Sequence, residues 1–143
     1  MNAFFKRCPF EITSYIMQYT YMPQNKILLN DIVNFTEKKQ ELYKLFLHYW
    51  ILHNEPEEYI NWLSNDITLY TNNFRHTGEL YGGGYTDIFY ERFFRNPFLK
   101  SKENVKKYIG KLSGSNVKKE INIYLGLLTP TERQEFINWS NRN

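Results

Sequence analysis

The side chains best suited to chemistry in this sequence are one cysteine and three histidines. Cys8 is the single cysteine, so the chain cannot form an intrachain disulfide or a cysteine-based zinc cluster by itself. No GxSxG turn is present and no histidine is near Cys8 in sequence, so the sequence does not indicate a catalytic nucleophile. His48 and His53 are five residues apart, whereas metal ligands four apart share a helix face, and His76 stands beside a glycine loop. The pattern predicts no catalytic residue, no metal site and no cofactor.

Three consecutive glycines in "RHTGELYGGGYTD", residues 75–87, raise the possibility of phosphate binding. Backbone N–H groups of a glycine loop ahead of a helix can cradle a phosphate. The stretch lacks the Lys-Ser/Thr pair of a Walker loop and the spacing of GxGxxG, so a nucleotide site is not predicted. Glycine runs are costly in helices, and we expect a loop whose Tyr81 and Tyr85 pack back on the helices. The sequence therefore predicts that the protein is not an enzyme.

Apolar residues recur at helical spacing along most of the chain, and no run alternates with period two. The sequence predicts an all-α fold, a single compact helical domain of about seven helices with a Gly-rich loop between two sub-bundles. Within residues 1–143 the predicted parts are 9–35, front helices in 36–74 and a back bundle in 86–143. The predicted helices are 9–21, 25–52, 56–71, 86–96, 101–112, 116–128 and 130–141, and the second can be two helices split near "NFTEKKQ".

Capping residues support several of these boundaries. Pro56 suits the first position of a helix, where its missing N–H costs nothing. Ser101 and Ser115 are predicted N-caps of the helices that follow them. The sequence "TPTE" predicts a capping box, in which Thr129 caps the helix and Glu132 reaches back to its N–H.

The composition favours a folded intracellular protein. The 143 residues include 12 Tyr, 11 Phe and 3 Trp, whose large rings bury much area each and are scarce in disordered chains. The start "MNAFFKRCPFEI" lacks the long apolar run of a signal peptide, and no segment approaches the length needed to span a bilayer. We therefore expect an intracellular protein without membrane segments.

Positive charge gathers in residues 100–119, which hold seven Lys and one Glu, a net charge of +6. Such a segment can bind nucleic acid or an acidic partner, or it can form an ordinary solvated helix face. The stretch contains no Arg, which weakens bidentate recognition of phosphate. The candidate residues for an anionic surface are Lys102, Lys106, Lys107, Lys111, Lys118 and Lys119.

The segment "CPFEITSYIMQYTYMPQNKILLNDIVNF", residues 8–35, resembles an F-box. Pro9, Glu11, Ile12 and Ile16 match its opening signature, and Leu28, Leu29, Ile32 and Phe35 match its leucine-bearing helix, although Cys8 replaces the usual leucine. The resemblance implies a protein-interaction module that docks to a Skp1-type ubiquitin-ligase adaptor by helix-in-groove recognition. Its partner-binding residues would be Pro9, Phe10, Ile12, Ile16, Leu28 and Leu29. The alternative is that this apolar stripe packs on the protein's own helices.

A wider resemblance adds "WLSNDI" at 62–67 and "INIYLGLLTPTERQEFINW" at 121–139. Together with the opening segment, these blocks look like a family of small F-box-like proteins from giant DNA viruses. The resemblance implies a viral protein of the host cytoplasm, the virus factory or the virion. Two alternatives stay open: a virion structural or assembly protein, and a nucleic-acid-associated factor acting through residues 100–119.

Overall fold

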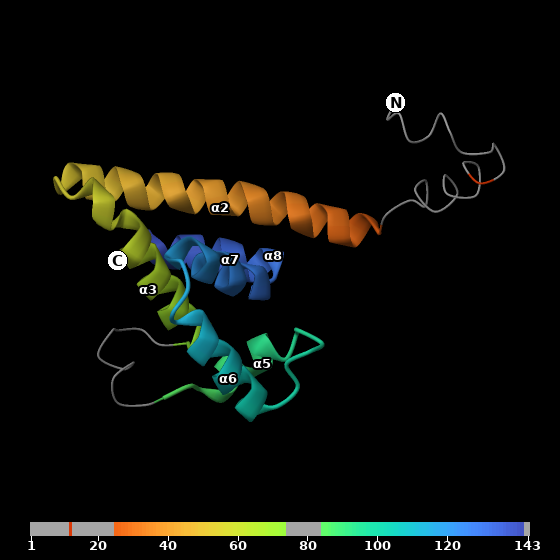
Figure 1. The fold of residues 1–143 in the computed structure, drawn as a ribbon. Helices are drawn as coiled ribbons and strands as arrows, with labels where there is room; N and C mark the ends of the chain where they lie inside the picture. Colours follow the sequence, from red (N-terminus) through yellow and green to blue (C-terminus); the bar gives the residue numbers. More distant parts are fainter. Residues whose placement is uncertain (1–11, 13–24, 74–83, 142–143) are drawn as a thin grey trace. The chain divides into compact units, whose positions relative to one another are not determined.

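The computed structural model describes residue 12 and residues 25–73 and 84–141 of the chain. The chain divides into two compact units, Met1–Ile32 and Val33–Asn143. The described residues form helices and no strand, which confirms the all-α prediction (Figure 1). The elements are α2 (Lys26–Leu52), the 3₁₀ turn η2 (Pro56–Glu58), α3 (Tyr59–Thr71), α5 (Asp87–Phe93), α6 (Lys102–Leu112), α7 (Val117–Leu127) and α8 (Pro130–Ser140).

Two parts of the predicted architecture fall outside these residues. The predicted helix 9–21 is described at residue 12 alone, and most of the predicted Gly-rich loop lies outside the described residues. The count of seven helices and the single domain with two sub-bundles therefore stay predictions. None of the described helices is long and apolar enough to cross a membrane.

Helix α2 runs without interruption for 27 residues, so the suggested split near "NFTEKKQ" is wrong. The segment contains neither glycine nor proline, and the ion pair between Lys38 Nζ and Glu41 Oε2 at 2.9 Å supports its middle. At its start, the Asn25 side chain accepts a hydrogen bond from the N–H of Ile27 at 2.9 Å. Only Leu42 and Phe46 are buried on this long helix.

The core of the unit Val33–Asn143 lies where α3 packs on α7. Ile67 and Ile121 are fully buried there, and Tyr124 of α7 meets Phe93 of α5 edge to face at 5.9 Å. Phe136 brings α8 into the same cluster. Phe89, Tyr90 and Phe93 of α5 are buried in this cluster as well, so this helix supplies part of the central core.

The N-caps confirm most of the predicted helix starts. Ser101 accepts from the N–H of Asn104, and Thr129 and Glu132 form the complete capping box. The prediction for Ser115 is wrong, because Asn116 is the N-cap and accepts from the N–H of Lys118 at 2.8 Å. Asn suits the N-cap as well as Ser does, so composition alone did not separate the two neighbours.

The predicted helix 86–96 is shorter in the structure, where α5 ends at Phe93. Pro97 disfavours helical backbone at Asn96, and the Asn96 side chain instead accepts the N–H of Phe98 at 2.9 Å. Thr86 caps the start of α5 by accepting the N–H of Phe89. The ring of Tyr85 stacks on Phe89 at 4.3 Å, which confirms that this tyrosine packs back on the helices.

A buried asparagine joins the end of α3 to the start of α5. Asn72 Nδ2 donates to the carbonyl of Gly84 at 3.1 Å, and Asn72 Oδ1 accepts from the N–H of Thr86 at 2.7 Å. The Thr86 hydroxyl returns a hydrogen bond to the carbonyl of Asn72 at 2.9 Å. Gly84 has φ +65°, a backbone conformation that glycine adopts without steric cost. These bonds fix the two chain segments side by side.

Candidate functional sites

The first two turns of α2 expose four large apolar side chains. Leu28 is 53% exposed and Leu29 40%, and Ile27 and Ile32 are also exposed. Leu28 and Ile32 are four residues apart and share a helix face with Leu29 beside them. Scattered apolar residues on a surface are normal, but contiguous ones often mark an interaction site.

Three of the six partner-binding residues taken from the F-box resemblance can be placed. Leu28 and Leu29 lie together on α2, and Ile12 is 52% exposed. Pro9, Phe10 and Ile16 lie outside the described residues. The exposure of the three described residues is the property that a docking surface requires.

The lysines of residues 100–119 are all exposed, on α6, on α7 and just before α6. Val105, Ile109 and Leu112 face the core, so the lysines of α6 occupy its outer side. Two of them have acidic partners: Lys102 Nζ lies 2.7 Å from Asp87 Oδ1, and Lys107 Nζ lies 2.9 Å from Glu103 Oε1.

The other four candidate lysines form no ion pair with any described acidic residue: Lys106, Lys111, Lys118 and Lys119. The pKa of Lys102 is raised by its hydrogen bond to Asp87, and its ammonium also lies 5.0 Å from the ring centre of Tyr90. The segment is therefore partly neutralised at Lys102 and Lys107, and its remaining charge faces solvent.

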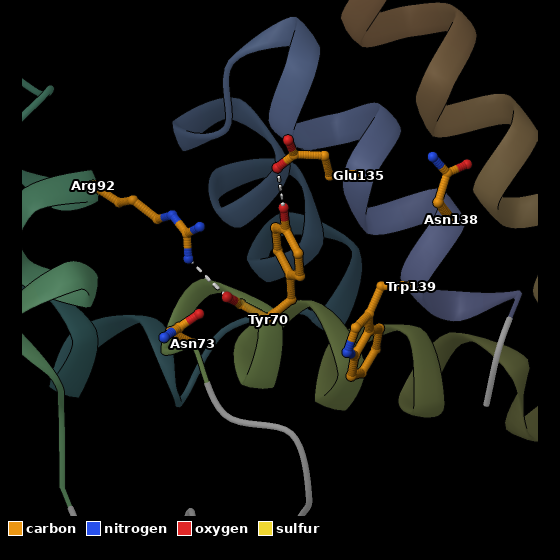
Figure 2. A pocket seen from close by; sticks show the side chains of 6 residues that line it. All are labelled: Tyr70, Asn73, Arg92, Glu135, Asn138 and Trp139. Atoms are coloured by element: carbon orange, nitrogen blue, oxygen red, sulfur yellow. Dashed lines mark hydrogen bonds between the residues drawn. The ribbon is translucent and has the colours of Figure 1, made fainter.

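A pocket of about 380 Å³ lies where α3, α5 and α8 meet (Figure 2). Its lining is Tyr70, Asn73, Arg92, Glu135, Asn138 and Trp139. Tyr70 stands in its centre and donates from its hydroxyl to Glu135 Oε2 at 3.2 Å. The ring of Trp139 lies 6.2 Å from that of Tyr70. Two amides, a carboxylate and an indole ring thus contribute to the lining of this hollow.

Arg92 in the pocket wall has a structural role. Its Nη1 donates to the carbonyls of Tyr70 and Thr71, both at 2.7 Å, and so caps the last turn of α3. Its Nε donates to Glu132 Oε1 at 3.2 Å, and its guanidinium lies 5.1 Å from the ring centre of Tyr70. Arg92 is almost entirely buried, so these contacts hold α3, α5 and α8 together.

The electrostatics of the pocket do not favour base catalysis by its tyrosine. Burial and the neighbouring Glu135 raise the pKa of Tyr70 to about 12. The phenol therefore stays protonated at neutral pH and cannot accept a proton there. Among the described residues, no three His, Cys, Asp or Glu side chains gather as metal ligands would.

Of the three histidines singled out in the sequence, the two that the structure describes do not line this pocket. His48 and His53 are exposed near the end of α2, and His53 Nδ1 is 2.8 Å from the carbonyl of Tyr49. His76 lies outside the described residues. Sequence reasoning missed the pocket, because its residues come from three helices distant in sequence. Arg92 was no distinct signal in the sequence, because α5 also contains the charged residues Asp87 and Glu91.

No protein-family model, no curated protein and no solved structure matches this chain. The F-box resemblance and the viral origin that it implies therefore stay predictions.

Proposed function

We propose that this protein is a non-enzymatic protein-interaction module that binds its partner through the start of α2. The observation that carries this proposal is the exposure of Leu28 and Leu29 on one face of a well-formed helix. An amphipathic helix that lays such a face into a groove is a common mode of protein recognition. Burying each leucine on binding is worth about 1.5–3 kcal/mol, depending on how far it is exposed beforehand.

The proposed partner is a Skp1-type ubiquitin-ligase adaptor. Leu28 and Leu29 fall in the F-box-like segment 8–35, and Ile12 of the same segment is exposed as well. Docking of this kind is driven by apolar burial, so the affinity should depend little on salt. The unit Val33–Asn143 would then hold the target or support the docking segment.

Calorimetric titration of the full chain with a purified Skp1-type adaptor tests this proposal. The variant Leu28→Asp/Leu29→Asp should bind at least about tenfold more weakly, because two carboxylates would enter an apolar groove. The matched control is Asn30→Asp, which adds charge at an exposed position of the same turn without removing an apolar side chain. Circular dichroism and thermal melting must show that each variant folds. If the folded wild type binds no adaptor, the adaptor assignment is wrong.

A second candidate function is binding of nucleic acid through residues 100–119. It is favoured by the exposure of Lys106, Lys111, Lys118 and Lys119 without acidic partners among the described residues. Affinity for single- or double-stranded DNA should then fall steeply with salt, because bound counterions are released. Lys118→Glu/Lys119→Glu should weaken binding to all sequences, whereas Leu28→Asp/Leu29→Asp should not. Binding that is independent of salt would contradict this candidate.

A further inference from the structure

The end of α2 and the start of α3 carry an exposed aromatic surface. The rings of Trp50 and Trp62 stack at 5.2 Å with an angle of 23°, and Tyr49 stacks on His53 at 4.2 Å. Trp62 is 41% exposed and Tyr49 is exposed as well. We call Tyr49, Trp50 and Trp62 the tryptophan face. Large rings that are partly open to solvent are typical of the residues that dominate the energy of protein interfaces.

The tryptophan face lies in a stretch of sequence that carries acidic residues and neither Lys nor Arg. Residues 45–74 contain no Lys or Arg and four acidic residues: Glu55, Glu57, Glu58 and Asp66. The N–H of Glu55 donates to the backbone carbonyl of Trp50 at 3.0 Å, so the backbones of these two residues lie next to each other. Glu58 precedes Trp62 by four residues and so lies one helical turn from it. Aromatic rings flanked by carboxylates attract Lys and Arg side chains, through cation–π contacts and ion pairs.

The same chain carries the opposite charge at a separate place. Residues 100–119 have a net charge of +6, and α6 presents its lysines on its outer side. The tryptophan face lies at the first turn of α3, whereas α5 is fixed to the last turn of α3 by Arg92, and α6 packs on α5. The 13 residues of α3 span about 20 Å, and Figure 1 shows α6 at the far end of α3 from the turn after α2. The two charged surfaces are therefore too far apart to neutralise each other within one unit.

We infer that the tryptophan face binds the lysine side of α6 in a second copy of this chain. Glu55 and Glu58 would pair with lysine ammonium groups, and the lysine stems would lie across Trp62. Lys106 and Lys111 are the α6 lysines without a described acidic partner; five residues apart, they lie on either flank of its outer side, and their long side chains would reach the carboxylates from both edges of the helix. The two surfaces differ, so the contact is head-to-tail and can repeat into an open chain. This surface is separate from Leu28 and Leu29, so the inference does not depend on the proposed docking function.

Sedimentation velocity of the full chain, free of nucleic acid, tests this inference. Wild type should associate as its concentration rises at about 20 mM salt, and about 500 mM salt should weaken the association, because ion pairs at a rim are screened. Trp62→Ala/Glu58→Gln and Lys106→Gln/Lys111→Gln should each weaken association at least about tenfold. Lys118→Gln/Lys119→Gln is the matched control: it removes the same charge from α7 and should associate like wild type. Circular dichroism must show the wild-type helix content in each variant.

Mixing the two weakened variants gives a sharper result. Trp62→Ala/Glu58→Gln retains the lysine side, and Lys106→Gln/Lys111→Gln retains the tryptophan face. An equimolar mixture should therefore form dimers that do not grow, at concentrations where each weakened variant alone is mainly monomeric. A monomeric wild type at low salt overturns the inference. So does association that is insensitive to salt, equal loss in the Lys118→Gln/Lys119→Gln control, or a mixture that forms no dimer.

Discussion

Arg92 of α5 and Glu132 of α8 form an ion pair at 3.2 Å between Nε and Oε1, across 40 residues of sequence. The same carboxylate accepts from Arg95 Nη2 at 3.0 Å and from the N–H of Thr129 at 2.8 Å. Glu132 thus caps its own helix and holds α5 at the same time. Since Arg92 also caps α3, this pair of residues connects three helices of the unit Val33–Asn143.

Replacing Glu132 by Gln should lower the free energy of unfolding at pH 7 by about 2 kcal/mol, because Arg92 keeps its buried charge and loses its counterion. Urea denaturation followed by circular dichroism measures this. Glu135→Gln is the control on the same helix, since Glu135 is exposed and should cost less than about 1 kcal/mol. Equal destabilisation by the two substitutions would contradict a central role for Glu132.

Acid should weaken the fold through this same residue. Burial alone would raise the pKa of Glu132, but hydrogen bonds from Arg95, the Thr129 backbone and Arg92 lower it to about 2. A depressed pKa in the folded state stabilises the protein above the unfolded value near 4.5, and this contribution disappears as the pH falls towards 2. The difference in stability between wild type and Glu132→Gln should therefore shrink between pH 4.5 and 2 in parallel urea titrations. A constant difference would show that the carboxylate is not the titrating group.

Asp66 should change the stability with pH in the direction opposite to Glu132. Burial raises its pKa from 3.8 to about 6, so the folded state binds a proton more tightly than the unfolded state. Stability from this group is present below pH 3.8 and is lost as the pH rises through 6. Asp66→Asn should therefore stabilise the protein by about 1 kcal/mol at pH 7.5, a value reduced for partial exposure, and by almost nothing at pH 3.5. Thermal melts at both pH values measure this, and no gain at pH 7.5 would contradict the prediction.

The local features of the fold were predictable because they depend on neighbours in sequence. The capping box at Thr129 and Glu132 follows from four consecutive residues, and the starts of α6 and α8 follow from Ser101 and Pro130. The last residue of α5 was harder to predict, because Pro97 disfavours helical backbone only at the residue before it, and the helix can end at any of several earlier positions. The choice of Asn116 over Ser115 as N-cap depended on backbone geometry that composition does not encode.

The tertiary features had no comparable local signal. Residue types alone do not show that the Arg92 side chain donates to the carbonyls of Tyr70 and Thr71 at the end of α3. Nor do they show that Glu132 forms ion pairs with both Arg92 and Arg95. The acidic surroundings of Trp50 and Trp62 can be read in the sequence as a span without Lys or Arg. That Trp50 and Trp62 form one aromatic surface follows only from the folded structure, in which the two rings stack.

Asn72 should be among the most sensitive polar residues of the unit Val33–Asn143. It is fully buried, and Asn72→Ala would leave the Gly84 carbonyl and the Thr86 N–H without their partner. The expected loss is about 2–4 kcal/mol in the free energy of unfolding. Asn65→Ala is the control, because Asn65 is exposed on α3 and alanine favours the helix. A loss below about 1 kcal/mol for Asn72→Ala would mean that water replaces these bonds.

Leu28 and Leu42 lie on the same helix, and their substitutions should separate a docking surface from a core. Leu42 is fully buried, so Leu42→Ala should cost about 2–5 kcal/mol through lost burial and the cavity left behind. Leu28 is 53% exposed, so Leu28→Ala should cost less than about 1 kcal/mol in the free chain. Urea denaturation of both variants measures the contrast. If Leu28→Ala costs as much as Leu42→Ala, Leu28 packs within the protein, and the proposed docking function loses the observation that carries it.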